Sequence, residues 1–261
     1  MTTLADYKDK YECIKFERRN DILQMTLHTN GDSLRWGLVP HRELPAAFFD
    51  VANDHENKVV ILTGTGAEFS GPQVIPSAGH PIFPTRPKME LVDALLSEGK
   101  QGLQNFLQID VPVVTAFNGP AWRHGEIPLM ADIVIAADTV AFQDSAHFQG
   151  GLVPGDGVHV VYPMLLGVNR ARYFLLTGQI LRAKEALEFG LVSEVLPVDR
   201  VLARAWEIAE GMAKKPKSLL RAARAVLTEK LKREAQDMLS FGLYAELLAL
   251  QDKPDSLQET K

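Results

Sequence analysis

The sequence has few of the features that mark several common classes of protein. Its single cysteine, Cys13, excludes an intrachain disulfide and a metal site built from cysteines, and this scarcity is typical of a reducing compartment. Its longest apolar stretches, such as residues 59–62 and 133–137, are far shorter than the roughly 20 residues that span a bilayer. The charged N-terminal segment, residues 1–19, holds no apolar run of the length that a secretory signal needs. We therefore expect a cytoplasmic protein that does not enter membranes.

Motifs of nucleotide-binding enzymes and serine hydrolases are also absent. The segment Gly64-Thr65-Gly66 lacks the third glycine of a dinucleotide-binding fingerprint, and the sequence contains no Walker motif. Neither Ser70 nor Ser145 lies in a Gly-x-Ser-x-Gly elbow, so a serine nucleophile has no support in the sequence. We expect no nucleotide cofactor.

The charge balance argues against a nucleic-acid partner, because the formal net charge is -5. Basic residues gather in one C-terminal segment: Lys214, Lys215, Lys217, Arg221, Arg224, Lys230, Lys232 and Arg233. Glu229, Glu234 and Asp237 interrupt this run, which favours a solvated helix face over a nucleic-acid patch. An RNA-binding protein is kept as an alternative that rests on this segment alone.

The composition is that of a globular protein, with 46% hydrophobic and 23% charged residues, and the length allows one large domain or two small ones. Continuous apolar runs that end in turn residues predict buried parallel strands at residues 59–63, 113–117 and 133–137. Helical periodicity over residues 43–52 and 91–107 precedes the first two of these strands. This alternation predicts an α/β fold.

After residue 165 the pattern becomes helical throughout, with predicted helices at residues 170–176, 183–189, 199–213 and 216–250. We therefore expect a core over residues 1–198 and a C-terminal helical region over residues 199–261. A proline-rich stretch from Pro72 to Pro87 predicts a long exposed loop that contributes to substrate contacts.

Two histidines follow predicted strands in segments rich in turn residues, His124 and His147, and loops at strand ends are where α/β proteins bind ligands. Asp156 lies nine residues after His147 in the glycine-bounded turn 153–157, which can bring its carboxylate back toward the upstream loop. The carboxylate would accept the Nδ1 hydrogen of His147 and leave Nε2 to take a proton from water. Alternatively, Asp156 bonds its own backbone and His147 is a hydrogen-bonded structural residue. The remaining histidines show no metal-ligand spacing with carboxylates and are interpreted as surface or packing residues: His28, His41, His55, His80 and His159.

Taken together, residues 59–70, 113–121, 130–137, 151–157 and 170–178 resemble the crotonase (enoyl-CoA hydratase/isomerase) superfamily. The resemblance extends over about residues 14–213. It implies an α/β fold built as a spiral of ββα units, followed by a C-terminal helical region that packs trimers. A homotrimer, or a dimer of trimers, is therefore the expected assembly.

The sequence departs from the family at the positions that serve hydration. Hydratases of the family follow the strand at residues 59–63 with an Ala-Gly-x-Asp segment whose backbone N–H helps form an oxyanion hole. Pro72 replaces the glycine of that segment here, which argues against the usual loop geometry. A second donor comes from a run of glycines, replaced here by Arg123-His124-Gly125. The two hydratase glutamates correspond to Ile127 and His147, so the ordinary hydration mechanism lacks both carboxylates.

These departures instead resemble the β-diketone hydrolase (6-oxocamphor hydrolase-like) branch of the superfamily. The matching segments are residues 33–36, 124–128, 142–148, 153–161 and 242–246. Five functional positions carry over with them: Trp36, His124, His147, Asp156 and Glu246. The resemblance implies a small-molecule diketone substrate and no cofactor.

The resemblance implies the following roles. His147, oriented by Asp156, would activate a water molecule, and Glu246 would position that water or assist proton transfer. The Nε1–H of Trp36 and His124 would hold the other carbonyl and stabilise its developing enolate charge, in place of backbone donors. The product would be a keto acid. Each residue also has a structural alternative: Trp36 as a core aromatic, Glu246 as a surface carboxylate and His124 as a loop histidine.

The main alternative function is that of a hydratase or isomerase acting on a CoA thioester, because most of the superfamily acts on CoA esters. The absence of both glutamates and the presence of Pro72 argue against it.

Overall fold

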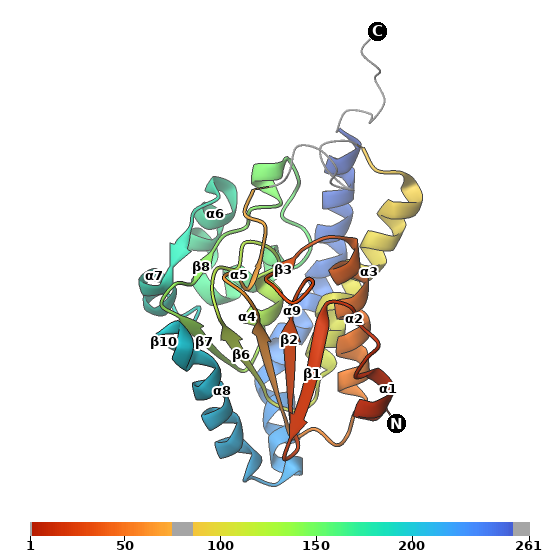
Figure 1. The fold of residues 1–261 in the computed structure, drawn as a ribbon. Helices are drawn as coiled ribbons and strands as arrows, with labels where there is room; N and C mark the ends of the chain where they lie inside the picture. The colour runs from red at the N-terminus through yellow and green to blue at the C-terminus, as the bar shows by residue number, and fades with distance from the viewer. Residues whose placement is uncertain (1, 75–85, 253–261) are drawn as a thin grey trace.

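The computed structural model describes residues 2–74 and 86–252, and its centre is one six-stranded sheet (Figure 1). The strand order is β1-β2-β4-β6-β7-β10. The strands are β1 (Ile14–Arg19), β2 (Ile22–Leu27), β4 (Val59–Gly64), β6 (Val113–Phe117), β7 (Ile133–Ala137) and β10 (Glu194–Leu196). Strand β1 pairs with β2 in antiparallel fashion, and all other neighbours in this sheet are parallel. The predicted parallel strands β4, β6 and β7 are confirmed.

Strand β4 shows why the central strands are apolar at every position. Successive side chains point to opposite faces of a sheet. Val60 and Leu62 face the cluster that includes helix α2 (Leu38–Ala52), whereas Val59 and Ile61 face helix α8 (Val198–Ala213). Because helices cover both faces, both sets of side chains are buried and the strand has no polar side.

A second ladder of short strands runs beside the ends of the large sheet. It contains β3 (Leu34–Arg35), β5 (Ser70–Gly71), β8 (Ala141–Phe142) and β9 (Leu181–Arg182). Strand β3 pairs with β5, and Ala121 bridges β5 to β8. Each repeat therefore supplies a long strand, a short extended segment and a helix, so the predicted spiral of ββα units is confirmed.

Every predicted helix is present with bounds within about five residues of the prediction, whereas helices α1, α4 and α5 were not predicted. The remaining helices are α1 (Leu4–Tyr7), α3 (Met89–Gln108), α4 (Glu126–Leu129), α5 (Val158–Leu166), α6 (Val168–Thr177), α7 (Ala183–Glu188) and α9 (Lys217–Gln251), with a 3-10 turn at Phe148–Gly150. Helix α5 contains three valines and Pro163, residues that disfavour helix, and tertiary packing overrides that local preference. Within the described part of the chain, no helix is both long and apolar enough to cross a membrane.

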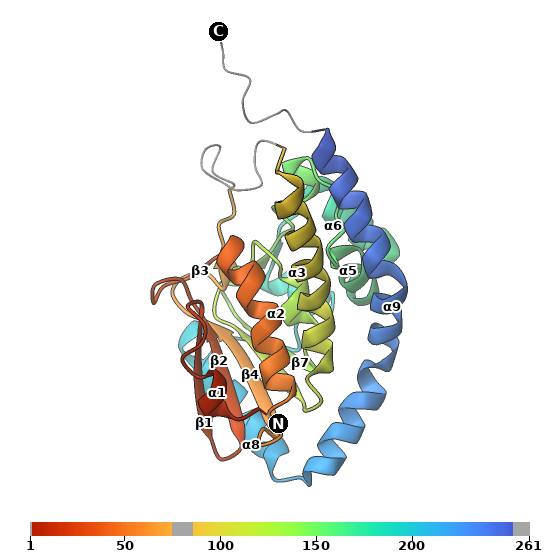
Figure 2. The same ribbon diagram turned by 90° about the vertical axis from the view of Figure 1, so that its right-hand side faces the viewer.

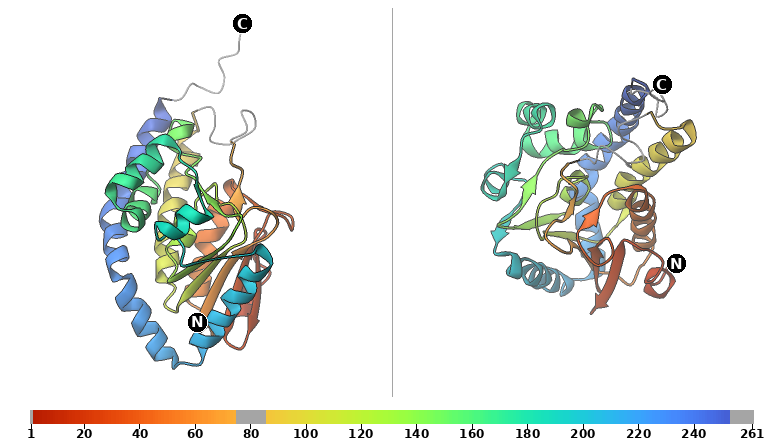
Figure 3. Two further views of the ribbon diagram at one scale, coloured as in Figure 1. Left: turned by 90° about the vertical axis from the view of Figure 1, so that its left-hand side faces the viewer. Right: turned by 45° about the horizontal axis from the view of Figure 1, so that its top comes forward.

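Helix α9 runs along the outside of the molecule, on the far side of α2 and α3 from the sheet (Figures 2 and 3). It packs against α3 and α5, whereas α8 packs on the sheet itself. The division into residues 1–198 and 199–261 stays a prediction. Exposed apolar side chains on α9 include Leu227, Phe241 and Leu248, but the expected packing of subunits through this region also stays a prediction.

Basic residues of the C-terminal segment pair with carboxylates of the protein itself. Arg221 pairs with Asp110, and Arg233 pairs with Glu229 one helical turn before it. Arg224 is almost fully buried and pairs with Asp132, which also accepts the N–H of Val113. The exposed Arg233 agrees with the predicted solvated helix face, whereas the buried Arg224 does not.

Replacing Arg224 by alanine should destabilise the fold strongly. The guanidinium pairs with Asp132 and donates to the carbonyl of Ile109 at 2.6 Å, and its loss would leave both acceptors buried without this donor. Breaking a buried pair typically costs about 3–5 kcal/mol of unfolding free energy, measurable by urea denaturation. Arg233→Ala, at a largely exposed ion pair, is the control and should change stability by less than about 0.5 kcal/mol. Equal effects of the two substitutions would contradict this account.

Candidate active site

A cavity lies at the carboxyl ends of β2, β4, β6 and β7, where the connecting loops converge. Its volume is about 700 Å³ when space up to its open mouth is included. Loop residues Trp36, Arg123, His124, His147 and Asp156 line it together with Glu246 of α9. The opposite wall is apolar and consists of leucines from α3, α9 and the loop after the 3-10 turn. The loops gather here because parallel strands all end at the same edge of a sheet.

Hydrogen bonds to backbone carbonyls hold these loops together. The N–H of Trp36 donates to the carbonyl of Gly71 at 2.7 Å, and the N–H of Trp122 donates to the carbonyl of Ser70 at 2.8 Å. The hydroxyl of Ser145 donates to the carbonyl of Trp122 at 2.8 Å. Side chains from three separate loops are thereby fixed relative to one another.

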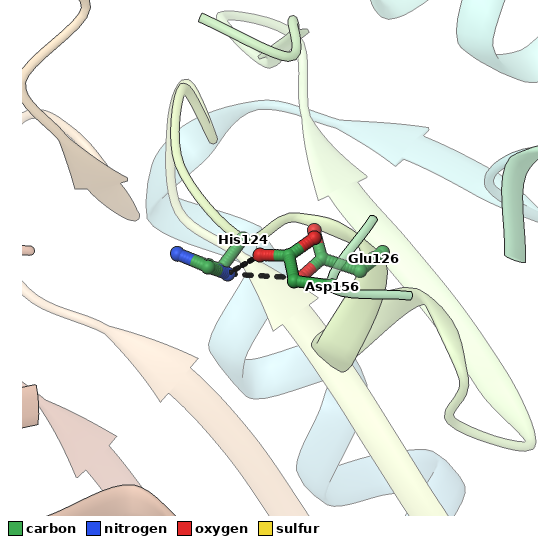
Figure 4. Close-up of side chains that lie close together, drawn as sticks. All are labelled: His124, Glu126 and Asp156. Carbon is green, nitrogen blue, oxygen red and sulfur yellow. Dashed lines mark hydrogen bonds and ion pairs between the residues drawn. The ribbon is translucent and has the colours of Figure 1, made fainter. Parts of the chain in front are cut away.

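His124 connects two carboxylates on one side of its ring. Its Nδ1 lies 3.0 Å from Glu126 Oε1 and 3.0 Å from Asp156 Oδ2, while Figure 4 shows its other ring nitrogen pointing away from both carboxylates. The ring stacks on Trp36 with a centroid distance of 4.0 Å. His124 also has a left-handed φ of 47°, a strained backbone conformation of the kind that gathers at functional sites.

His147 has a carboxylate at each ring nitrogen, but the pairing differs from the prediction. Its Nδ1 lies 2.8 Å from Asp144 Oδ1, and its Nε2 lies 3.2 Å from Asp156 Oδ2 and 3.7 Å from Glu246 Oε1. We predicted that Asp156 would hold Nδ1, and that detail is wrong. The short Asp144-x-x-His147 turn places Asp144 there instead, with its Oδ1 also accepting the N–H of His147 at 3.3 Å.

Asp156 Oδ2 is the atom that joins the two histidines. Burial acts to raise the pKa of the Asp156 carboxyl, but His147 and His124 outweigh burial and hold that pKa well below its usual range. Conversely, burial acts to lower the pKa of His124, and Asp156 and Glu126 outweigh it, raising the pKa to about 9. The pKa of His147 is raised well above its usual value by Asp144, Asp156 and Glu246 in opposition to burial. Both imidazoles are therefore cationic at neutral pH.

The pKa values of the two glutamates are raised, whereas that of Asp156 is lowered. Burial, the larger cause, raises the pKa of Glu246 to about 8, with His147 opposing it and Asp156 reinforcing it. Burial and the negative charge of Asp156 also raise the pKa of Glu126, against the effect of His124. Glu246 thus exchanges a proton close to neutrality, the range in which an acid–base catalyst works best.

The indole of Trp36 supplies a hydrogen-bond donor that has no acceptor within residues 2–74 and 86–252. Its Nε1 is buried there without a partner, and an unmade hydrogen bond of a buried donor costs about 1–3 kcal/mol. A carbonyl oxygen in the cavity would satisfy it. The stack with His124 places this donor beside a cationic ring.

The structure brings together all five residues that the sequence singled out: Trp36, His124, His147, Asp156 and Glu246. Sequence reasoning did not assign functional roles to Asp144, Glu126 or His41. His41 was interpreted as an ordinary histidine, yet it lines the cavity and packs edge-on against both Trp36 and His124. His80 and most of the Pro72 to Pro87 loop, residues 75–85, lie outside the described residues.

Two groups of potential metal ligands share Asp156, although the sequence shows no metal-ligand spacing. One group is His124, Glu126 and Asp156, and the other is His147, Asp156 and Glu246. Imidazole and carboxylate are donors that a divalent cation such as Zn²⁺ accepts. Within the described residues the same atoms already satisfy one another's charges.

Glu246 enters the cavity because α9 approaches the 153–157 turn closely. Gly155 and Gly242 face each other so tightly that a Cβ on either would collide with the backbone of the other. Beside this contact, His159 Nε2 lies 3.1 Å from the carbonyl of Met238. Glu246 stands one turn further along α9.

Gly242→Ala should therefore destabilise the protein although alanine favours helix. The added methyl would collide with Gly155 and His159, and overpacking of this kind costs about 1–3 kcal/mol. Gly211→Ala in α8 is the control, because its Cβ would meet no atom and should stabilise the protein by about 0.5–1 kcal/mol. Thermal unfolding of both variants measures the contrast, and stabilisation by Gly242→Ala would refute the close contact.

The chain is similar in sequence and in fold to known proteins. The family model described as enoyl-CoA hydratase/isomerase matches residues 17–258. A β-diketone hydrolase from the cyanobacterium Anabaena, solved with (S)-3-oxocyclohexyl acetic acid, is 44% identical with a TM-score of 0.88, over 95% of this chain and 97% of that one. An enoyl-CoA hydratase/isomerase from Mycobacterium paratuberculosis is 26% identical with a TM-score of 0.83, over 93% and 95%.

A curated relative, a probable enoyl-CoA hydratase from Mycobacterium bovis, is 32% identical over 224 residues, covering 80% of this chain and 75% of that protein. A carnitinyl-CoA dehydratase from Citrobacter koseri is 30% identical over 206 residues, covering 77% and 74%. The family match spans most of the chain, and the fold is shared over nearly its whole length. The chain therefore belongs to the enoyl-CoA hydratase/isomerase family, the crotonase superfamily that its motifs resemble.

Proposed function

We propose that this enzyme hydrolyses the C–C bond between the two carbonyl groups of a β-diketone, a retro-Claisen reaction that yields a keto acid without a cofactor. One observation carries the proposal: Asp156 separates a proton-transfer pair, His147 with Glu246, from a donor pair, His124 with Trp36. The similarity to the Anabaena β-diketone hydrolase supports it, and the ligand of that enzyme is itself a keto acid.

The reaction needs a base at one carbonyl and hydrogen-bond donors at the other. Water adds its oxygen to the first carbonyl carbon and gives up a proton. The C–C bond then breaks, and its electron pair becomes an enolate on the second carbonyl. Protonation of the enolate carbon completes the keto acid. The site has to remove a proton at one end and stabilise negative charge at the other.

The proton of the attacking water goes to the His147–Glu246 pair. In the substrate-free site His147 is cationic and Glu246 holds a proton up to a pH of about 8. Once the pair has lost one proton, the remaining proton can reside on either partner. When it resides on Glu246, the Nε2 of His147 carries a lone pair and acts as the base. Asp144 keeps the ring oriented through Nδ1 in both forms.

The enolate oxygen is stabilised by the Trp36 Nε1–H and by the far ring nitrogen of His124. Both groups are present before the reaction begins, so little reorganisation is needed when the charge develops. The pKa of about 9 keeps His124 cationic, and a cationic donor makes a stronger hydrogen bond to an oxyanion than a neutral one.

The alternative is a hydratase or isomerase acting on a CoA thioester, as the names of the curated relatives indicate for those proteins. At the two positions of the hydratase glutamates this chain has Ile127 and His147. The Ile127 side chain is buried and cannot transfer a proton. Pro72 replaces the glycine of the oxyanion-hole loop of the hydratases, and its fixed φ argues against the usual geometry of that loop.

Purified protein should convert cyclic 1,3-diketones to products heavier by one water, detected by mass, and His147→Ala should lower that turnover by about a hundredfold or more. His55→Ala, at an exposed histidine outside the cavity, is the matched control and should keep wild-type turnover. Crotonyl-CoA is assayed in parallel. Turnover of the CoA ester without any diketone hydrolysis would overturn the proposal and favour the alternative.

The pH profile of kcat/KM should be bell-shaped with its maximum between about pH 8 and 9. Activity should rise as Glu246 loses its proton near its pKa of about 8, because only then can the pair accept one. It should fall as His124 loses its charge near its pKa of about 9. Glu246→Gln, which cannot ionise, should move the acidic limb away from pH 8, because the only proton that the pair can then lose is the one on His147. A flat wild-type profile from about pH 6 to 10 would contradict the assigned roles.

A further inference from the structure

Arg123 is a charged residue of the cavity wall that the proposed reaction leaves without a role. It lies in the loop after β6, immediately before His124, and is only 5% exposed. Its Nε donates to the carbonyl of Pro72 at 2.9 Å, and its own carbonyl accepts the hydroxyl of Ser70 at 2.5 Å. Arg123 is therefore held in place by one hydrogen bond of its side chain and one of its backbone.

One end of this guanidinium lacks an acceptor. Its Nη2 is buried and has no hydrogen-bond partner among the residues that the structure describes. Burial lowers the pKa of Arg123 to about 10, with Asp144 opposing that effect, so the side chain stays cationic at neutral pH. A buried cation with an unmade hydrogen bond is costly unless a ligand supplies the missing acceptor.

We propose that Arg123 forms an anion subsite that binds the carboxylate group of an alicyclic or aliphatic acid, in particular the acid that the reaction produces. The role as a product subsite rests on the proposed function. Guanidinium and carboxylate are matched in shape and charge, and their hydrogen bonds are among the strongest that side chains make. A neutral diketone would gain less from the same group.

Asp144 links Arg123 to the place where that carboxylate forms. Its Oδ1 holds the Nδ1 of His147 at 2.8 Å, and its negative charge acts on Arg123. Arg123 and His147 thus both lie near Asp144, and both line the cavity. Water activated by His147 becomes part of the new carboxylate, so the acid forms in the cavity that Arg123 lines.

The apolar part of the cavity lining determines which hydrocarbon groups the acid can carry. The cavity is also lined by the leucines Leu95, Leu152, Leu243, Leu247 and Leu250. They suit a hydrocarbon ring or chain, which is buried more favourably than a polar one. The cavity therefore combines an apolar wall with a cationic end, the features of a site for a hydrophobic carboxylate.

The test compares cyclohexylacetate with its neutral amide, cyclohexylacetamide, by calorimetry in a buffer without carboxylate or phosphate. Wild-type protein should bind the acid about ten- to a hundredfold more tightly than the amide. Arg123→Gln should weaken binding of the acid by about tenfold or more and change binding of the amide less than about twofold. Arg123→Lys should recover part of the loss, because it restores the charge without the planar fork. Arg172→Gln, which removes an exposed charge from α6, is the matched control and should bind both ligands like wild type.

Equal wild-type affinities for the acid and the amide would overturn the subsite, and this comparison needs no variant to fold. Unchanged acid binding in a folded Arg123→Gln, verified by circular dichroism, would overturn it as well. Diketone turnover is measured separately on the same wild-type protein. If the acid is preferred but no diketone is hydrolysed, the proposed function fails and the anion subsite stands. If diketones are hydrolysed without any preference for the acid, the subsite alone fails.

Discussion

The arrangement of the site depends on one buried carboxylate. Asp156 Oδ2 lies 3.0 Å from His124 and 3.2 Å from His147, so a single oxygen sets the distance between two rings that come from different loops. The two cations keep this carboxylate ionised although it is buried, and it keeps both of them protonated in return. Each charge is stable in the interior only because the others are present. The opposed roles that we propose for the two histidines rest on their positions on either side of Asp156.

The surrounding fold maintains that cluster by holding its contributors at close range. Glu246 reaches the cavity only because Gly155 and Gly242 let α9 approach the turn that carries Asp156. Near its other end, the same helix is anchored by the buried Arg224 through its pair with Asp132 at the start of β7. A long helix fixed at two points places one carboxylate accurately beside His147. Packing contacts of α9 outside the cavity in this way determine the position of Glu246 beside His147.

Much of the fold could be read from local patterns. The apolar run at residues 59–63 predicted a strand buried on both faces, and the structure shows helices on both sides of it. Helix α5 was missed because its valines and Pro163 disfavour helix in isolation. The five site residues were recognised because their segments match the β-diketone hydrolase branch at its functional positions. His41 escaped notice because its role depends on packing against Trp36 and His124, two residues distant from each other in the chain.

The sequence by itself determined the kinds of residue available: two histidines in loops after strands, an aspartate in a glycine-bounded turn and a glutamate on the last long helix. Only the tertiary structure decided which atoms meet. Asp144, and not Asp156, holds Nδ1 of His147, and Asp156 instead joins the two rings. Spacing along the chain limits which residues can approach one another, but the orientation of a ring depends on every loop packed around it. For that reason the protonation states, and the division of roles that we propose from them, are properties of the assembled site.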